Sequence, residues 1–187
     1  MAEKRLIVGV SGASGICIAE ELLRLVGSQN QWETHLIVSD SARQAMAYEY
    51  PKGEKGLAAL ATRLCRIGNL ADSVSSGTYT TEGMVIIPCS MKTVAGIASG
   101  YSDNLLLRAA DVVLKERRKL VLVPRETPLS TIHCRNLLEL SRLGVILVPP
   151  VMTFYNHAQT IPDMVRHIAC KALEPFGMEN LPFQRWS

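Results

Sequence analysis

Serine residues follow three apolar runs of this sequence, where they could together bind an anion. The turn Ser11–Gly15 follows the first run, Ser39 ends the second, and Ser90 follows the third. Taken singly, a serine at such a place most often caps a helix. A glycine-rich turn is often only a compact connection, and this one lacks the GxGxxG spacing of dinucleotide sites. A tight turn at a helix N-terminus also brings backbone N–H groups to an anion, so the three places together predict a cradle for the phosphate and ring of a mononucleotide.

A cation and a carboxylate stand side by side after a further apolar run. Arg125 and Glu126 follow Leu120–Val123, separated from it by one proline. As an ion pair on a solvated loop, these two residues would contribute little stability. Their place at the end of a predicted strand is therefore the more specific indication, and it favours ligand binding.

Opposite charges also alternate in the segment before that run. Arg108, Asp111 and Lys115 are spaced by three and four residues, so they share one side of a helix. From spacing alone, a solvated ion-pair ladder is favoured over a binding site. The histidines show no ligand pattern and are interpreted as surface or core residues: His35, His133, His157 and His167.

Apolar runs alternate with segments of helical periodicity along the chain. The predicted strands are Arg5–Val10, Thr34–Ser39, Gly83–Pro88, Leu120–Val123 and Val145–Val148. The predicted helices are Ile16–Val26, Ser41–Tyr48, Leu57–Leu64, Met91–Ala98, Asn104–Arg117 (capped by Ser102 or Asp103), Ser130–Leu143 and Thr160–Pro175. This alternation is typical of an α/β fold with a doubly wound parallel sheet in three layers, and we expect one domain over residues 1–187. Ligands of such sheets bind beyond the carboxyl ends of the strands.

Composition narrows the class of protein. The 187 residues are 48% apolar and 20% charged, which suffices for a sizeable core. A net charge of +3 does not by itself indicate nucleic acid, and no apolar stretch has the length of a membrane span or a signal peptide. The five scattered cysteines show no metal-ligand spacing, and we expect free thiols in a cytoplasmic protein.

The polar segments, in this order, resemble those of the UbiX-type flavin prenyltransferases, a family also described as one component of phenolic acid decarboxylases. The resemblance covers essentially the whole chain, and its most specific stretches are PCSMKT, ending at Thr93, and RAADVVLKERR with VPRE, ending at Glu126. Other matching stretches are SGASG from Ser11, ETHLIVS to Ser39, Glu49 in YEY, GVILVPP, Phe154–Tyr155 and Arg185–Trp186. The resemblance implies a flavodoxin-like fold and a homo-oligomer, a dodecamer, with FMN between subunits.

The resemblance also implies ligands for particular residues. FMN would be bound by Gly12, Ala13, Ser14, Ser39, Ser90, Met91, Lys92, Thr93 and Arg125. The prenyl phosphate would be bound by Tyr155 and by Lys171, which stands where the family has an arginine. A lysine keeps the positive charge but loses the planar, bidentate fork of arginine.

The implied reaction joins dimethylallyl phosphate to reduced FMN, first at N5 and then at C6, and releases phosphate. Breaking the allylic C–O bond leaves an allyl cation and a phosphate anion, so the site needs fixed cations and an aromatic pocket but no metal. The expected cations are Lys115, Arg125, Lys171 and Arg108, and the expected walls are Tyr155 and Trp186. Ser14 would orient groups near N5, and Glu126, rather than Glu49, is expected as base or proton relay for the C6 proton, a role that released phosphate could share.

Three other functions stay open from the sequence. A flavin-dependent cysteine decarboxylase shares the fold but uses a histidine and a PASANT-like motif, where this sequence reads PCSMKT. A non-catalytic FMN-carrying subunit would bind FMN without consuming prenyl phosphate, and an electron-transfer flavodoxin would leave the charges of Arg108, Lys115, Arg125 and Glu126 without a purpose. We expect a UbiD-type aromatic acid decarboxylase to receive the product, and no decarboxylation by this chain alone.

Overall fold

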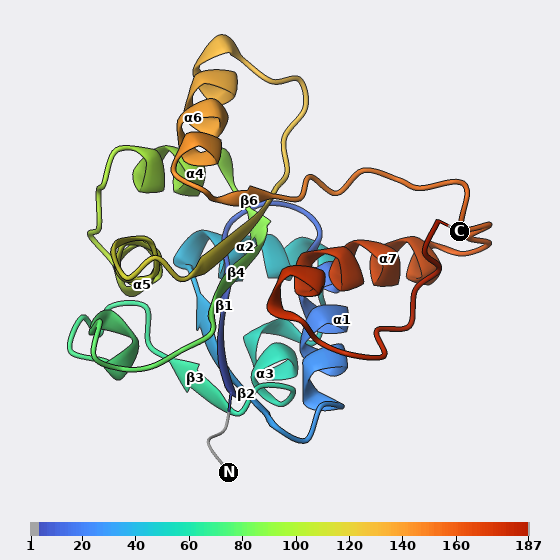
Figure 1. The fold of residues 1–187 in the computed structure, drawn as a ribbon, viewed down its shortest axis with the longest axis horizontal. Helices are drawn as coiled ribbons and strands as arrows, with labels where there is room; N and C mark the ends of the chain where they lie inside the picture. Colours follow the sequence, from blue (N-terminus) through green and yellow to red (C-terminus); the bar gives the residue numbers. More distant parts are fainter. Residues whose placement is uncertain (1–3, 187) are drawn as a thin grey trace.

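The computed structural model describes residues 4–186 and contains one parallel sheet of six strands in the order β3-β2-β1-β4-β5-β6 (Figure 1). Every pair of neighbouring strands is parallel. The strands are β1 (Lys4–Val10), β2 (Trp32–Val38), β3 (Arg63–Cys65), β4 (Gly83–Cys89), β5 (Lys119–Pro124) and β6 (Ile146–Leu147). All carboxyl ends therefore lie at one edge of the sheet, which is the expected place for a ligand.

Helices cover both faces of the sheet. One face packs against α1 (Ile16–Gly27), α2 (Asp40–Glu49), α3 (Gly53–Ala58) and α7 (Ile161–Leu173), and the other against α4 (Met91–Ala98), α5 (Leu105–Lys115) and α6 (Thr131–Arg142). Side chains of successive residues in β1 point to opposite faces, so Leu6 and Val8 join the first core and Ile7 joins the second. Two short 3₁₀ helices complete the chain, Ser73–Ser75 and Glu174–Phe176. The predicted three-layer, doubly wound α/β fold is confirmed.

One predicted element is wrong. Leu57–Leu64 is predicted as a helix, but α3 lies earlier and Arg63–Cys65 forms the edge strand β3. Thr34 in β2 and Thr62 exchange hydrogen bonds of 3.0 Å between their backbone N–H groups and hydroxyls. Pairing with β2 outweighs the helical preference of this segment, because a sheet edge offers hydrogen bonds that the local sequence does not reveal.

Element ends agree with local capping residues, with one exception. Thr160 and Asp163 form a reciprocal capping box at the start of α7, as the sequence predicts. Helix α5 is capped by Asn104 instead of Ser102 or Asp103, because Asn104 Oδ1 accepts from the N–H of Leu107 at 3.1 Å.

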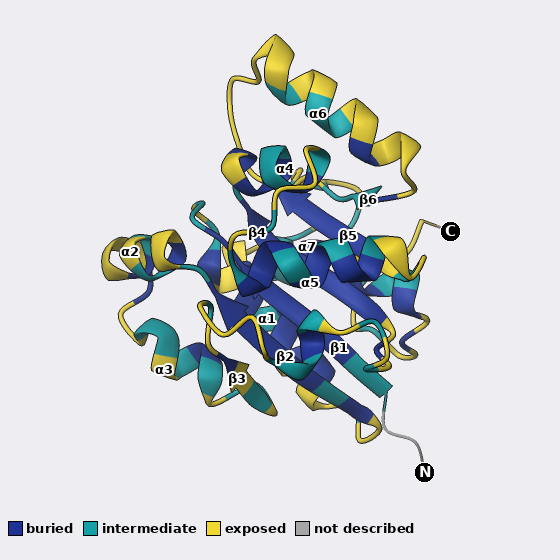
Figure 2. Ribbon diagram, turned by 90° about the vertical axis from the view of Figure 1, so that its left-hand side faces the viewer, coloured by how far each residue is buried: buried dark blue, intermediate teal, exposed yellow. Residues whose placement is uncertain are grey.

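Helix α6 projects from the body of the molecule and is mostly exposed, as Figure 2 shows. Leu140 is its one buried residue. Within residues 4–186, no helix is long and apolar enough to cross a membrane.

Candidate functional site

The turn between β1 and α1 is closed by a carboxylate from another helix. Gly15 precedes α1 with a φ of 114°, in the left-handed region that favours glycine, and has no side chain to cap the helix. Glu49, the last residue of α2, takes that role. Its Oε1 accepts from the N–H groups of Gly15 at 2.7 Å and Ile16 at 2.9 Å, and its Oε2 accepts from Ser14 Oγ at 2.6 Å. The protein itself therefore supplies the anion at this helix N-terminus.

The environment of Glu49 holds it in the ionised form. Burial alone raises the pKa of this carboxyl, but the hydrogen bonds from Ile16, Ser14 and Gly15, with the positive charge of Arg125, outweigh burial and lower the pKa. This coupling also shows that Arg125, beyond the end of β5, lies near the glycine turn. A low pKa and three accepted hydrogen bonds make Glu49 a poor base and suit it to positioning the turn.

Serine hydroxyls cap the helices that follow β2 and β4, as the sequence predicts. Ser39 Oγ accepts from the N–H of Ala42 at 3.1 Å, and Ser90 Oγ accepts from the N–H of Thr93 at 3.3 Å. Ser11 Oγ in turn accepts from the N–H of Ser90 at 2.7 Å and so joins the glycine turn to α4. The three strand ends thus form one connected surface.

A cavity of about 350 Å³ opens between these helix ends. It is lined by Ser39, Asp40, Ser41, Ile67, Gly68, Lys92, Asp103 and Asn104. The turn between β1 and α1 packs against Ser41, which lines this cavity: a Cβ at Gly12 would lie 2.5 Å from Cβ of Ser41. Hydroxyls, an ammonium group and the N-terminus of α4 form a donor set that fits a phosphate-bearing ligand such as FMN.

Tyr155, Lys171 and Trp186 gather at the same edge of the sheet, beyond β6. Tyr155 and Lys171 line a cavity of about 250 Å³ together with Val148, which follows β6. The rings of Tyr155 and Trp186 meet edge to face with their centroids 5.1 Å apart. Lys171 Nζ donates to Glu174 Oε2 at 2.6 Å. The structure therefore brings together the two residues expected to bind prenyl phosphate and the expected aromatic wall.

Lys115 does not join the other predicted cations within one chain. It ends α5 directly before β5, at the amino edge of the sheet, whereas Arg125 follows β5 at the carboxyl edge. A strand of this length separates the two edges by roughly 20 Å. Lys115 Nζ pairs with Glu116. The expected convergence of Lys115, Arg125 and Lys171 is thus not found in a single chain.

Arg108 lies on the same helix as Lys115 and is also paired. Its Nη1 donates to Asp111 Oδ2 at 2.7 Å, which agrees with the ion-pair ladder that spacing favours. Among residues 4–186, Asp111 forms an ion pair with Arg108 but not with Lys115, so one of the two expected pairs is present. Arg108 and Lys115 lie on α5, which covers the face of the sheet opposite to α7 and Lys171.

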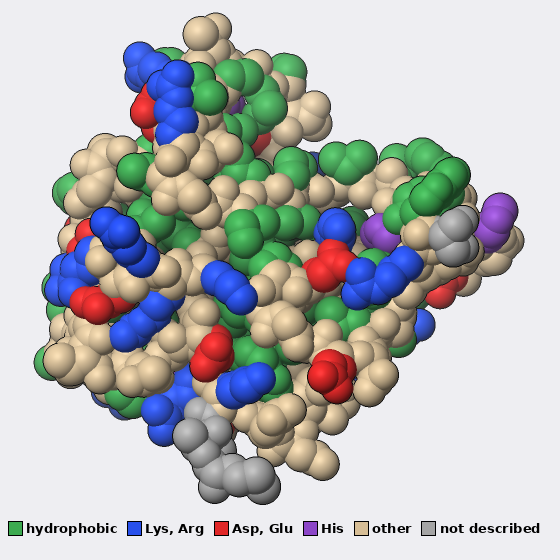
Figure 3. All heavy atoms as spheres, in the orientation of Figure 1, with side chains coloured by type: hydrophobic (Ala, Val, Ile, Leu, Met, Phe, Trp, Pro, Cys, Tyr) green, Lys and Arg blue, Asp and Glu red, His purple; other side chains and the backbone are tan. Residues whose placement is uncertain are grey.

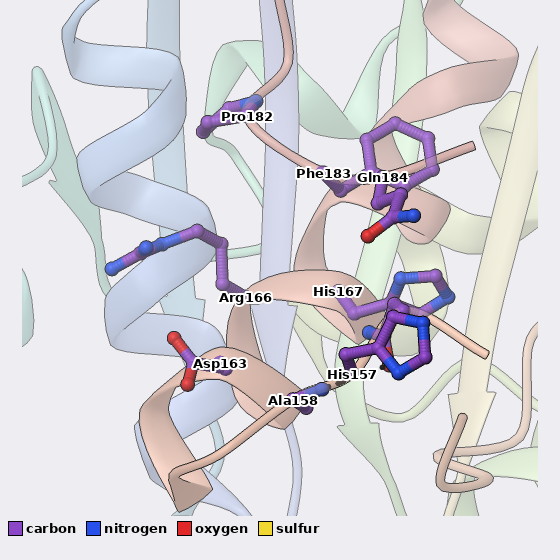
Figure 4. A pocket seen from close by; sticks show the side chains of 9 residues that line it. His157, Ala158, Asp163, Arg166, His167, Pro182, Phe183 and Gln184 are labelled. Atoms are coloured by element: carbon purple, nitrogen blue, oxygen red, sulfur yellow. Dashed lines mark hydrogen bonds between the residues drawn. The ribbon is translucent and has the colours of Figure 1, made fainter. Parts of the chain in front are cut away.

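His167 is a residue whose place in the site the sequence does not reveal, since its pattern indicates only a surface or core histidine. It lines the Tyr155–Lys171 cavity and also a neighbouring cavity of about 280 Å³ (Figure 4). Its ring contacts those of Tyr155 and Phe183 edge to face, with centroids 6.1 Å and 5.5 Å away. The one signal in the sequence is its spacing of four residues from Lys171, which places both on one face of a helix.

Comparison with known proteins gives one consistent result. The model of the family described as Flavoprotein matches residues 1–173. A probable UbiX-like flavin prenyltransferase of Escherichia coli O157:H7 is 50% identical over 97% of this chain and 92% of its own length. The flavin prenyltransferase LpdB of Lactiplantibacillus plantarum is 46% identical, with 98% of each chain covered.

Solved structures agree with these sequence relatives. A dodecameric FMN-dependent UbiX-like decarboxylase from Escherichia coli O157:H7 superposes with a TM-score of 0.95 at 49% identity, covering 98% of this chain and 99% of the other. AnUbiX (PadA1), in complex with FMN and dimethylallyl pyrophosphate, has a TM-score of 0.95 at 42% identity and covers 99% and 98%. The FMN-dependent cysteine decarboxylase TvaF shares only the fold, with a TM-score of 0.67 at 16% identity, covering 94% and 99%.

Proposed function

The chain belongs to the flavoprotein family and, within it, to the UbiX-like flavin prenyltransferases, and we propose how its residues carry out that reaction. It is an FMN-dependent enzyme that joins the dimethylallyl group of dimethylallyl phosphate to reduced FMN, at N5 and C6, with release of phosphate. The high identity to flavin prenyltransferases excludes the cysteine decarboxylase alternative, whose representatives match below 25% identity.

The phosphate and ring of FMN bind at the connected strand ends. Ser39 and Lys92 line the cavity beyond β2 and β4, and the turn Gly12–Ser14 and the residues Ser90–Thr93 adjoin it through Ser41 and Ser11. Arg125 adds a cation near this turn. Because Glu49 already occupies the N-terminus of α1, the phosphate is held by the N-termini of α2 and α4 and by Lys92. Ser14, fixed by Glu49, faces the ligand from the turn.

The prenyl phosphate binds in the cavity lined by Tyr155 and Lys171, and the ring of Trp186 packs on Tyr155 beside this cavity. This cavity is the observation that carries the proposal, since it combines a cation, a phenol hydroxyl and an aromatic wall at the ligand-binding edge. The departing phosphate is stabilised by Lys171 and Tyr155, while the aromatic rings stabilise the allyl cation. Glu126, exposed beside Arg125, accepts the C6 proton that is lost on ring closure.

The remaining cations come from a second copy of the chain. Arg108 and Lys115 lie on α5, which covers the face of the sheet opposite to α7 and Lys171, and Lys115 lies at the amino edge. In a homo-oligomer, such as the dodecamer of the related Escherichia coli structure, these side chains enter the site of a neighbour. The product then serves a UbiD-type aromatic acid decarboxylase as its prenylated flavin cofactor.

Anaerobic incubation of the pure protein with reduced FMN and dimethylallyl phosphate tests this function. Mass spectrometry of the released flavin should show one added dimethylallyl group, and a protein that binds FMN but leaves the flavin unchanged is a non-catalytic carrier instead. The Glu126→Gln variant should bind FMN normally and stall before the second bond. The absorbance spectrum separates the one-bond product from the cyclised one, and normal cyclisation in the variant would remove Glu126 from proton transfer.

A further inference from the structure

His167 stands in the wall between two neighbouring cavities. The first is the cavity lined by Tyr155 and Lys171, and the second is lined on one side by His157 and Gln184. Figure 4 shows the ring of His167 between the side chains of His157 and Gln184. A group that reaches a nitrogen of His167 must therefore enter through one of these two cavities.

Neither ring nitrogen of His167 hydrogen-bonds to a described residue. The side chain is almost entirely buried, with 8% of its surface exposed, and Nδ1 is enclosed without a partner. Nε2 is not enclosed and so is the nitrogen that opens to a cavity. Burying a polar group without a partner is unfavourable, and a bound ligand that supplies the partner recovers this cost. Because His167 also lines two cavities, a ligand in either of them can supply that partner.

The surroundings of His167 favour an anionic ligand that accepts hydrogen bonds. Burial, and then the nearby charge of Lys171, lower the pKa of His167, so the ring is neutral at neutral pH and can donate from Nε2. Lys171 supplies a positive charge one helical turn away on α7. Tyr155 and Phe183 fix the plane of the ring from two sides. The ring is thus a rigid, uncharged donor beside a cation.

We propose that Nε2 of His167 donates a hydrogen bond to the phosphate of the prenyl phosphate, as a third substrate-contacting residue beside Tyr155 and Lys171. This inference rests on the proposed function. A phosphate monoester presents three strong acceptor oxygens, so it can accept from all three side chains at once. The contribution of His167 also differs from that of Lys171, whose ammonium group is shared with Glu174. His167 therefore strengthens and orients phosphate binding without adding charge.

The test measures binding of dimethylallyl phosphate to protein loaded with oxidised FMN, where no transfer takes place. His167→Phe keeps the aromatic contacts but removes both nitrogens, and it should raise the dissociation constant about ten- to a hundredfold, as expected for a hydrogen bond to a charged acceptor. His167→Gln places an amide nitrogen near the position of Nε2 and should restore most of the affinity. With reduced FMN, KM should rise in His167→Phe far more than kcat falls.

Controls separate this role from a structural one. His157→Phe alters only the second cavity and should leave the affinity unchanged; an equal loss there would place the phosphate in the second cavity and overturn the proposal. An unchanged dissociation constant in His167→Phe, or no recovery in His167→Gln, would also overturn it. If His167→Phe does not fold, His167→Asn replaces it, because its amide ends near Nδ1. A wild-type protein that never prenylates FMN contradicts the proposed function itself, which is a distinguishable result.

Discussion

Two carboxylates at the ligand-binding edge differ in what surrounds them. Glu49 accepts hydrogen bonds from Ser14 and from two backbone N–H groups. Glu126 accepts from the N–H of Thr127 beside it at 3.0 Å and forms no other hydrogen bond with residues 4–186. A carboxylate whose lone pairs are occupied holds other groups in place, whereas an exposed one can receive a proton. These surroundings suit Glu49 to a positioning role and Glu126 to the proposed proton transfer.

Glu49→Gln should destabilise the protein moderately at neutral pH. The amide oxygen can still accept from the N–H groups of α1, but the negative charge beside Arg125 and the helix N-terminus is lost. We expect the free energy of unfolding to fall by about 1 kcal/mol, a value typical of helix capping and already reduced for the solvent exposure of this side chain. Urea denaturation of wild type and variant, followed by circular dichroism, measures the difference.

The same pair of proteins should respond differently to acid. Because the folded state lowers the pKa of Glu49 below its unfolded value near 4.3, its stabilising effect is complete above that value and is lost as the pH falls through the folded pKa. The stability gap between wild type and Glu49→Gln should therefore shrink between about pH 5 and pH 3. Asp40→Asn, at the exposed start of α2, is the matched control, and a gap that stays constant in acid would contradict the assignment.

Residue roles were predictable where the partner is close in sequence. Ser39, Ser90 and Thr160 cap helices that begin directly after them, and their residue types predict this. The partners of Glu49 lie 33 to 35 residues away, so its role depends on the packing of α2 against the glycine turn. The part played by His167 likewise depends on cavities that only the folded chain creates.

The edge strand β3 shows how an element can depend on one side-chain network. His35 in β2 is buried, and its Nδ1 accepts from Arg63 Nε in β3 at 2.9 Å. Arg63 Nη2 also donates to Asp72 Oδ1 at 2.7 Å, and the hydroxyl of Tyr79 lies 3.3 Å from His35 Nε2. Three residues are too few for a periodic pattern, so the sequence could not predict β3. Its register is set by pairing with β2 and by this network.

Removal of His35 should make the free energy of unfolding less dependent on pH in mild acid. Burial first, and the charge of Arg63 second, lower the pKa of His35, so the unfolded chain binds a proton near pH 6.5 before the folded protein does. Stability is therefore lost as the pH falls below about 6.5, with a slope of up to about 1.4 kcal/mol per pH unit. In His35→Gln this slope between pH 7 and pH 5 should be markedly smaller.

Chemical denaturation at several pH values provides the measurement for His35. The matched control is His157→Gln, which removes an exposed histidine outside the network and should keep the wild-type slope. An identical slope in His35→Gln and wild type would mean that other groups dominate in this range. Loss of the Arg63 partner could also lower stability at pH 7, but that offset is independent of the slope.

At the scale of the molecule, the sequence predicts the sheet better than it predicts the site. Alternating apolar strands and helices predict the layers, because a strand that is buried on both faces has a nearly continuous run of apolar residues. The predicted cations, by contrast, lie at both edges of the sheet, since Lys115 precedes β5 and Arg125 follows it. The proposal that a neighbouring copy supplies Lys115 explains why no pattern within one chain groups these cations. Exposed apolar residues on α6 and in the segment after β6, along the upper side of Figure 3, form a surface of the kind that marks contacts between proteins.

Assembly should be sensitive to charge on the apolar side of α6. Ile132 and Leu143, 59% and 63% exposed, lie about three helical turns apart and share one side of this projecting helix. A glutamate at position 132 would bury a charge in a contact between copies, so Ile132→Glu should shift the protein to smaller species in size-exclusion chromatography with light scattering. Ser141→Glu adds the same charge on the opposite side and should keep the wild-type mass.

Because Lys115 and Arg108 are proposed to act in a neighbouring copy, the dissociated Ile132→Glu protein should also lose prenyl transfer while circular dichroism shows an intact fold. Full activity in a dissociated, folded monomer would mean that one chain completes the site by itself.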